Sequence, residues 1–236
     1  MFRIIQLIVL FATISQANEQ IILVISDDFN ATTAKLYSFE KNASEYEPVF
    51  PPIDVNLGRS GLGWGEGLIP IAHSQNEPLK REGDGRAPSG VFSLYNAFGY
   101  ANTRSTKLNY IPVSRDLICV DDVTDSHYNQ VLHVKNRSAL KSFEKMLRDD
   151  DLYELGVMVQ HNKENTPSYG SCIFLHVQKG INKPTAGCTT MSKEELTQLI
   201  SWLDQKKNPL LIQVPKAYYH DILTYFPKLP ELSILK

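Results

Sequence analysis

Closely spaced glycines and prolines between residues 51 and 90 constrain the fold of this chain more than any other feature. Both residue types interrupt helices, so this stretch predicts loops and short strands. Elsewhere, short runs rich in aliphatic and β-branched residues predict strands at 21–26, 34–39, 91–94, 157–160, 172–177 and 210–214. These strands do not alternate regularly with helical segments. The pattern therefore favours a mainly β domain over an alternating α/β fold.

A few segments have the features of helices. Ser138 can cap a helix over 138–148, where apolar residues recur at helical spacing. Ser192 and Glu195 form a capping box, and an apolar stripe follows it as far as residue 203. A weaker helix is expected at 218–225. We therefore expect one to three helices packed against the β domain.

The N-terminus has the layout of a secretory signal peptide over residues 1–17. Arg3 precedes an apolar run at 4–14, and Ser15-Gln16-Ala17 fits a small-x-small cleavage site. The apolar run is about half the roughly 20 residues of a membrane-spanning helix, and a buried N-terminal strand is the alternative. We expect a periplasmic or secreted protein with no integral membrane segment after cleavage.

Charge argues against binding to nucleic acid. The chain has 24 basic and 26 acidic residues, a formal net charge of −2, and no block of like charges. Proteins that bind nucleic acid normally present a basic face. His127 and His133 have no companion ligand cluster, so neither a metal site nor a cofactor is expected. The sequence leaves the oligomeric state open.

Three cysteines in an exported chain leave at least one without a partner. Cys119 and Cys172 lie in apolar, strand-like runs, whereas Cys188 lies in a polar, loop-like stretch. If two of them are bridged, Cys119 and Cys172 are the better pair, because that pairing leaves Cys188 free. Two buried free thiols are an equally good interpretation.

His176 and Cys188 could form a nucleophile and base. His176 closes an apolar strand, and Cys188 follows after a loop that contains Gly180, Pro184 and Gly187. A cysteine acyl-transferase needs a thiolate, a base that generates it, and donors for the oxyanion. Gly187 permits a tight turn that could aim its own amide and that of Cys188 at one oxygen. A helix start soon after Cys188 could lower the pKa of the thiol.

These residues resemble the catalytic segments of the L,D-transpeptidases of the YkuD type. Residues 173–176 and 184–191 (Ile-Phe-Leu-His and Pro-Thr-Ala-Gly-Cys-Thr-Thr-Met) are similar to the family's histidine strand and Gly-Cys nucleophile loop. Residues 80–92 resemble its Thr-Pro-x-Gly-x-Phe segment, and the turn at 58–61 resembles the glycine turn before it. The resemblance covers most of the chain after residue 17.

The resemblance implies one catalytic domain over 18–236, a β-sandwich or barrel that acts on peptidoglycan stem peptides. The thiolate would expel the terminal D-alanine of a stem and form a thioester, which an amine of a neighbouring stem resolves as a cross-link. Resolution by water would make the protein an L,D-carboxypeptidase. Ala186 and Thr190 stand where the family usually has histidine and arginine or asparagine, and these departures slightly favour a third alternative, a catalytically silent peptidoglycan-binding module. The intact His176, Gly187 and Cys188 favour an enzyme more strongly.

The resemblance also assigns roles to individual residues. Cys188 is the nucleophile, His176 the general base, and Gly187 part of the oxyanion hole. Substrate contacts are expected from Thr185, Thr189, Thr190, Ser171 and Arg86. The group that orients His176 is either Ser171 or a backbone carbonyl, and the odd spacing of Ser171 on the same strand places it on the opposite face.

Overall fold

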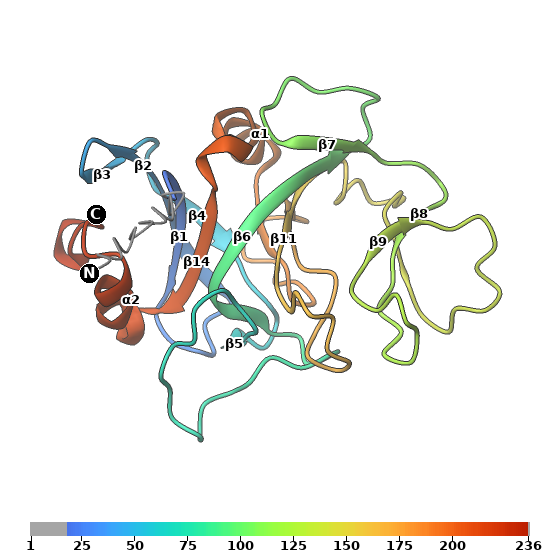
Figure 1. Ribbon diagram of the computed structural model, residues 1–236, viewed down its shortest axis with the longest axis horizontal. Helices are drawn as coiled ribbons and strands as arrows, with labels where there is room; N and C mark the ends of the chain where they lie inside the picture. Colours follow the sequence, from blue (N-terminus) through green and yellow to red (C-terminus); the bar gives the residue numbers. More distant parts are fainter. Residues whose placement is uncertain (1–17, 236) are drawn as a thin grey trace, which may run out of the picture.

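Eight strands close into a mixed β-barrel at the centre of the molecule (Figure 1). The computed structural model describes residues 18–235, so the predicted signal peptide lies outside the described residues. Around the barrel the order is β1 (Gln20–Ser26), β14 (Leu210–Pro215), β6 (Ala87–Gly99), β11 (Leu155–Val159), β12 (Phe174–Val177), β13 (Thr189–Met191), β4 (Ile53–Asn56) and β2 (Thr33–Asn42), which returns to β1. The expected mainly β fold is confirmed.

Shorter elements extend the barrel. The pairs β1–β14 and β12–β13 are parallel, and the other pairs around the barrel are antiparallel. Strand β3 (Glu45–Pro48) pairs with β2, while β5 (Leu62–Trp64) and β7 (Asn109–Pro112) pair with β6. Three 3-10 turns are η1 (Gln205–Lys207), η2 (Lys216–Tyr218) and η3 (Leu232–Ile234). A closed barrel leaves none of its eight strands as an open edge.

Helix α1 (Lys193–Trp202) packs into the core of the barrel. It starts at the expected capping box, in which Ser192 Oγ accepts from the Glu195 amide at 3.2 Å and Glu195 Oε2 accepts from the Ser192 amide at 3.0 Å. Leu196, Leu199 and Ile200 are buried among the inward-facing strand residues. The local capping signal and the apolar stripe therefore predicted this helix correctly.

Helix α2 (Tyr219–Tyr225) covers the outer side of β1 and β14. Strand β1 is buried on both faces, because Ile22 and Val24 pack inside the barrel while Ile21 and Leu23 pack in a second apolar cluster with α2. Burial on both faces explains why this strand is a continuous apolar run without alternation. The weaker helix expected at 218–225 is confirmed.

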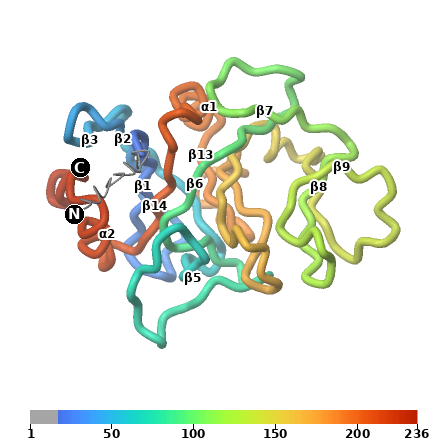
Figure 2. The backbone as a smooth tube through the Cα atoms, viewed as in Figure 1, coloured from blue at the N-terminus to red at the C-terminus, as the bar shows by residue number. Residues whose placement is uncertain are grey.

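A small antiparallel sheet covers the outer face of β11 and β12. Its order is β10 (Glu144–Lys145), β8 (Leu117–Cys119) and β9 (Val131–His133). It lies at the opposite end of the molecule from α2 (Figure 2). A disulfide joins Cys119 of β8 to Cys172, just before β12, and Cys188 is free. The bridged interpretation of Cys119 and Cys172 is therefore the one observed, and such a bond is compatible with an oxidising compartment.

The helix expected at 138–148 is wrong. Residues 144 and 145 form β10, which pairs with β8, and the Met146 amide donates to the Leu117 carbonyl at 3.2 Å. Met146 is buried, whereas Leu147, part of the expected apolar stripe, is exposed. Pairing with a strand distant in sequence overrides the local helical spacing. Within residues 18–235, no helix is long and apolar enough to cross a membrane.

Candidate active site

A pocket with a volume of about 320 Å³ opens on the outer face of β12. Both residues of the predicted nucleophile–base pair, Cys188 and His176, line it. The remaining lining residues include Arg59, Glu144, Arg148, Leu152, Tyr153, Lys179, Lys183, Thr185, Ala186 and Thr190. The loop after β12, the small sheet and the segment after β4 therefore all contribute to one site.

Two parallel strands bring the thiol and the imidazole to this pocket. Strands β12 and β13 pair with Leu175 opposite Thr189, so Cys188 immediately precedes the paired region. Because side chains alternate along a strand, Leu175 points into the barrel core while Phe174 and His176 point outward. The Phe174 amide donates to the Cys188 sulfur at 3.4 Å, and the thiol donates to the Cys172 carbonyl at 3.6 Å. Across residues 18–235, no hydrogen bond joins the two side chains directly.

A backbone carbonyl orients His176. Its Nδ1 lies 2.9 Å from the Val177 carbonyl oxygen. Since a carbonyl can only accept, Nδ1 carries the proton and Nε2 is the nitrogen that can act as a base. Ser171 does not take this role, because its hydroxyl donates to Glu82 Oε2 at 2.7 Å.

Tyr153 packs against the imidazole of His176, and Glu144 holds Tyr153 in place. The Tyr153 ring meets the His176 ring edge to face, with centroids 4.9 Å apart. The Tyr153 hydroxyl donates to Glu144 Oε2 at 2.7 Å, and Arg148 lies over the same ring at 4.9 Å from its centroid. Burial raises the pKa of Glu144 and of Tyr153. Sequence reasoning missed both residues, since Glu144 fell in the expected helix and Tyr153 carried no signal.

Burial keeps both members of the pair uncharged in this state. It raises the pKa of Cys188 to about 12 and lowers the pKa of His176 to about 4. The Val177 carbonyl opposes the shift of His176, and the positive charge of Arg148 adds to it. The net pKa of the thiol is therefore raised, because burial outweighs the groups that lower it.

The loop before Cys188 is held by Thr185. Its hydroxyl donates to the Cys188 carbonyl at 2.7 Å and accepts from the Gly187 amide at 3.0 Å. A Cβ on Gly187 would lie 3.0 Å from the Arg86 carbonyl oxygen, so the backbone passes too closely here for a larger residue. The Gly187 amide expected in the oxyanion hole is therefore engaged within the loop in this state.

The two threonines that follow Cys188 point in different directions. Thr190 lines the pocket and accepts from Asn56 Nδ2 at 3.4 Å. Thr189 is buried and donates to Gln213 Oε1 at 2.6 Å, on the other side of the sheet. Of the expected substrate-contact residues, Thr185 and Thr190 line the pocket, whereas Thr189, Ser171 and Arg86 do not.

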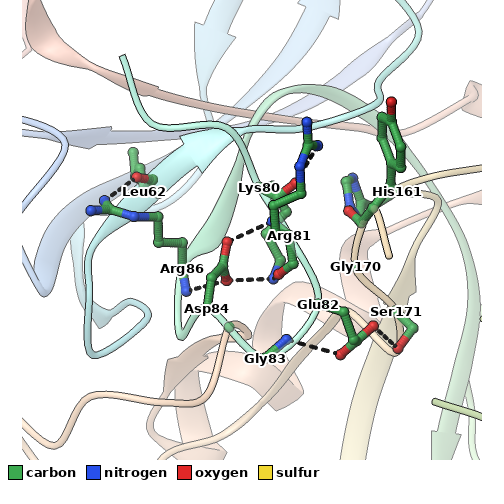
Figure 3. Close-up of polar contacts among 12 residues, drawn as sticks. Leu62, Lys80, Arg81, Glu82, Gly83, Asp84, Arg86, His161, Gly170 and Ser171 are labelled. Carbon is green, nitrogen blue, oxygen red and sulfur yellow. Dashed lines mark hydrogen bonds and ion pairs between the residues drawn. The ribbon is translucent and has the colours of Figure 1, made fainter. Parts of the chain in front are cut away.

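Arg86 holds the glycine-rich segment in place through hydrogen bonds to nearby backbone and carboxylate groups. Its guanidinium donates to the Leu62 carbonyl at 2.7 Å, and its amide donates to Asp84 Oδ1 at 2.8 Å (Figure 3). The guanidinium also donates to the Phe29 carbonyl at 3.2 Å. Lys80 is only 4% exposed and pairs with the same carboxylate at 2.7 Å. These contacts make the segment at 80–86 structural rather than part of the pocket.

Ser171 belongs to a second buried polar contact. Its hydroxyl donates to Glu82 (Figure 3). The Tyr128 hydroxyl also donates to Glu82 and accepts from the Gly170 amide. The contact joins the glycine-rich segment to the chain that leads into β12. Ser171 therefore supports the site from a distance and does not reach the pocket.

Basic side chains surround the pocket. Arg59, Arg148, Lys179 and Lys183 line it, and Arg148 is also paired with Asp150 at 2.8 and 2.6 Å. The only acidic residue in the lining, Glu144, is bonded to Tyr153. Lys179 and Lys183 lie between His176 and Cys188 in the sequence, and their positions indicate this basic rim. The rim suits an anionic ligand such as a peptide carboxylate.

Two histidines outside the pocket, His127 and His133, pair with neighbouring carboxylates. His127 pairs with Asp125 at 3.0 Å, and His133 pairs with Asp116 at 3.2 Å. In the part of the chain that the structure describes, no group of three or more His, Cys, Asp or Glu side chains could hold a metal ion.

A scan against protein-family models finds no match to this chain, and searches of curated proteins and of solved structures find none either. The function therefore has to be inferred from the residues and their arrangement.

Proposed function

We propose that this protein is a cysteine acyl-transferase that acts on peptidoglycan stem peptides as an L,D-transpeptidase. The observation that carries the proposal is the shared pocket of Cys188 and His176, with a basic rim around it. A stem peptide ends in a carboxylate, and this rim supplies cations that suit it. The sequence resemblance described above supplies the reaction class.

The proposed reaction begins with proton transfer. His176 Nε2 accepts the Cys188 proton as the sulfur attacks the carbonyl carbon of the third stem residue. The bond to the terminal D-amino acid breaks, its amine leaves with the proton from His176, and a thioester remains. An acceptor amine then attacks the thioester, forms the new amide and returns the proton to the sulfur through His176. With water as the acceptor, the product is a tripeptide, and the enzyme is an L,D-carboxypeptidase.

Substrate binding has to activate this pair. A neutral buried thiol and a neutral imidazole form an unreactive resting state, because the thiolate is the nucleophile. Catalytic hydrogen bonds are often long or unformed in the free enzyme and tighten in the substrate complex. Cys188 and Gly187 amides could stabilise the oxyanion once Gly187 is released from Thr185.

A second candidate function is a silent stem-peptide-binding module. It is favoured by the bond between the Gly187 amide and Thr185, and by a thiol that donates to the Cys172 carbonyl instead of to His176. In that case the basic pocket would bind stems without cutting them.

Acylation by a carbapenem separates the two candidates. A transpeptidase should yield a covalent adduct on Cys188 by intact-protein mass spectrometry. The adduct should be absent in Cys188→Ser and at least tenfold slower in His176→Gln. A folded wild-type protein that binds stem peptides and gives no adduct would support the silent module instead.

A further inference from the structure

A second pocket of about 300 Å³ lies on the same outer face of the barrel as Cys188. Strands β6 and β11 form its floor, and the turn before β9 in the small sheet forms one wall. Met158 lines this pocket and also packs in the apolar cluster that contains Phe174 and Cys188. The two pockets share no lining residue, so they are separate openings. We call the second one the amide groove.

A β-bulge aims two successive side chains at this groove. Where β6 pairs with β11, Leu94 lies opposite Val159 and Ala97 lies opposite Val157. Tyr95 and Asn96 therefore stand against the single residue Met158. Leu94 and Ala97 both point into the barrel core, which leaves the two bulged residues on the outer face. Bulges often redirect side chains in this way beside functional sites.

The groove presents polar groups that the protein does not use. Within residues 18–235, no hydrogen bond involves the Tyr95 hydroxyl or the side-chain amides of Asn96, Gln130 and Gln160. His161 also lines the groove and is 2% exposed. Its Nε2 is paired with the Tyr169 carbonyl at 3.0 Å, so this ring is held in place and is not one of the free polar groups.

The wall of the groove is held rigidly. Asn129 adopts a left-handed backbone with φ of 62°, and its side-chain nitrogen donates to the carbonyls of His161 and Asn162, each at 3.0 Å. Its oxygen accepts from the Cys172 amide at 3.0 Å. One asparagine therefore ties the turn before β9 to the loop after β11. A rigid wall means that little ordering is required when a ligand binds.

We propose that the amide groove binds a neutral saccharide. Side-chain amides both donate and accept, which matches hydroxyl and acetamido groups, and the groove has no carboxylate and only one charged residue, Lys163. An extended peptide is a poorer fit on the floor of the groove, because the main chain of β11 is already paired there. The Val159 amide donates to the Ile173 carbonyl and the Gln160 amide donates to the Ser93 carbonyl, so neither amide is free for strand addition.

Titration of the full-length protein with N-acetylglucosamine tetrasaccharide tests this proposal. Calorimetry gives the Kd, and NMR of the side-chain ¹⁵NH₂ groups shows which amides contact the ligand. The double variant Asn96→Ala/Gln160→Ala should bind at least tenfold more weakly. The matched variant Asn102→Ala/Gln75→Ala removes the same two exposed polar types elsewhere and should bind as the wild type does.

Saccharide binding in the amide groove does not depend on the proposed reaction at Cys188. Cys188→Ser should bind the saccharide unchanged, and the groove variant should still be acylated by a carbapenem if the wild type is. Absence of saccharide binding by the folded wild type overturns the proposal, as does equal binding by the groove variant. Preferential binding of a neutral tetrapeptide in the groove would also overturn it.

Discussion

Cys188 and His176 line the same pocket because side chains alternate along the paired strands β12 and β13, and that part of the site could be predicted from sequence. Thr189 and Thr190 show where the same reasoning stops. Residues 189–191 form a short strand between two partners, so one threonine faces the pocket and the other faces the core. The sequence there looked like a loop, and no alternation was expected. Ser171 and Arg86 bond to groups from other segments, which spacing along the chain does not reveal.

The buried thiol leads to a prediction on reactivity. Because the pKa of Cys188 is raised to about 12, its thiolate fraction at pH 8 is far below that of an ordinary cysteine with a pKa near 8.5. We expect iodoacetamide to alkylate Cys188 in the folded protein on the order of a thousandfold more slowly than in the unfolded chain. The rate should rise about tenfold per pH unit above pH 8.

Mass spectrometry of the alkylated peptide measures this rate. Protein unfolded in urea without reductant is the control, since it keeps the Cys119–Cys172 bond and exposes Cys188. A folded protein that reacts at the unfolded rate at pH 8 would contradict the buried, neutral resting state.

Among the elements, those with local signals could be predicted and those that depend on distant pairing could not. The α1 capping box is contained in four consecutive residues, 192–195. By contrast, β10 exists only through its pairing with β8, and its own residues have helical spacing. The bulge at Tyr95 and Asn96 likewise follows from the register against β11 and has no mark in the sequence of β6.

The capping box gives a prediction on stability. Ser192→Ala removes the acceptor of the Glu195 amide at the start of α1, and we expect the free energy of unfolding to fall by about 1 kcal/mol. Ser201→Ala lies at the other end of the same helix on an exposed position, and it should change stability by less than about 0.5 kcal/mol. Urea denaturation of both variants measures the difference. Equal losses in the two would mean that the cap does not stabilise the helix.

At the scale of the whole molecule, the closure of the barrel could not be predicted from the sequence. The strands at 21–26 and 210–214 were both expected, but their parallel pairing joins opposite ends of the chain, with Ile21 opposite Leu210. Nothing in either run specifies its partner, because both strands are buried on both faces and mostly apolar. A mainly β class was therefore predictable, whereas the strand order was not.

The disulfide gives a prediction on the stability of the whole molecule. Cys119 and Cys172 are 53 residues apart, and their bond joins the small sheet to the barrel beside the pocket. Cys119→Ala/Cys172→Ala should lower the free energy of unfolding by about 2–4 kcal/mol, because the unfolded chain regains entropy. Wild-type protein reduced with dithiothreitol keeps the same side-chain positions and should lose a similar amount. Unchanged stability in both would refute a structural role for the bond.

Incubation of purified protein with tetrapeptide muropeptides tests the central claim, that Cys188 and His176 together transfer an acyl group. We expect loss of the terminal D-alanine, with cross-linked dimers or tripeptides identified by mass spectrometry. Cys188→Ala and His176→Ala should each abolish turnover while keeping the circular dichroism spectrum of the folded wild type. Full turnover in either variant, or intact tetrapeptide with the folded wild type, would contradict the account.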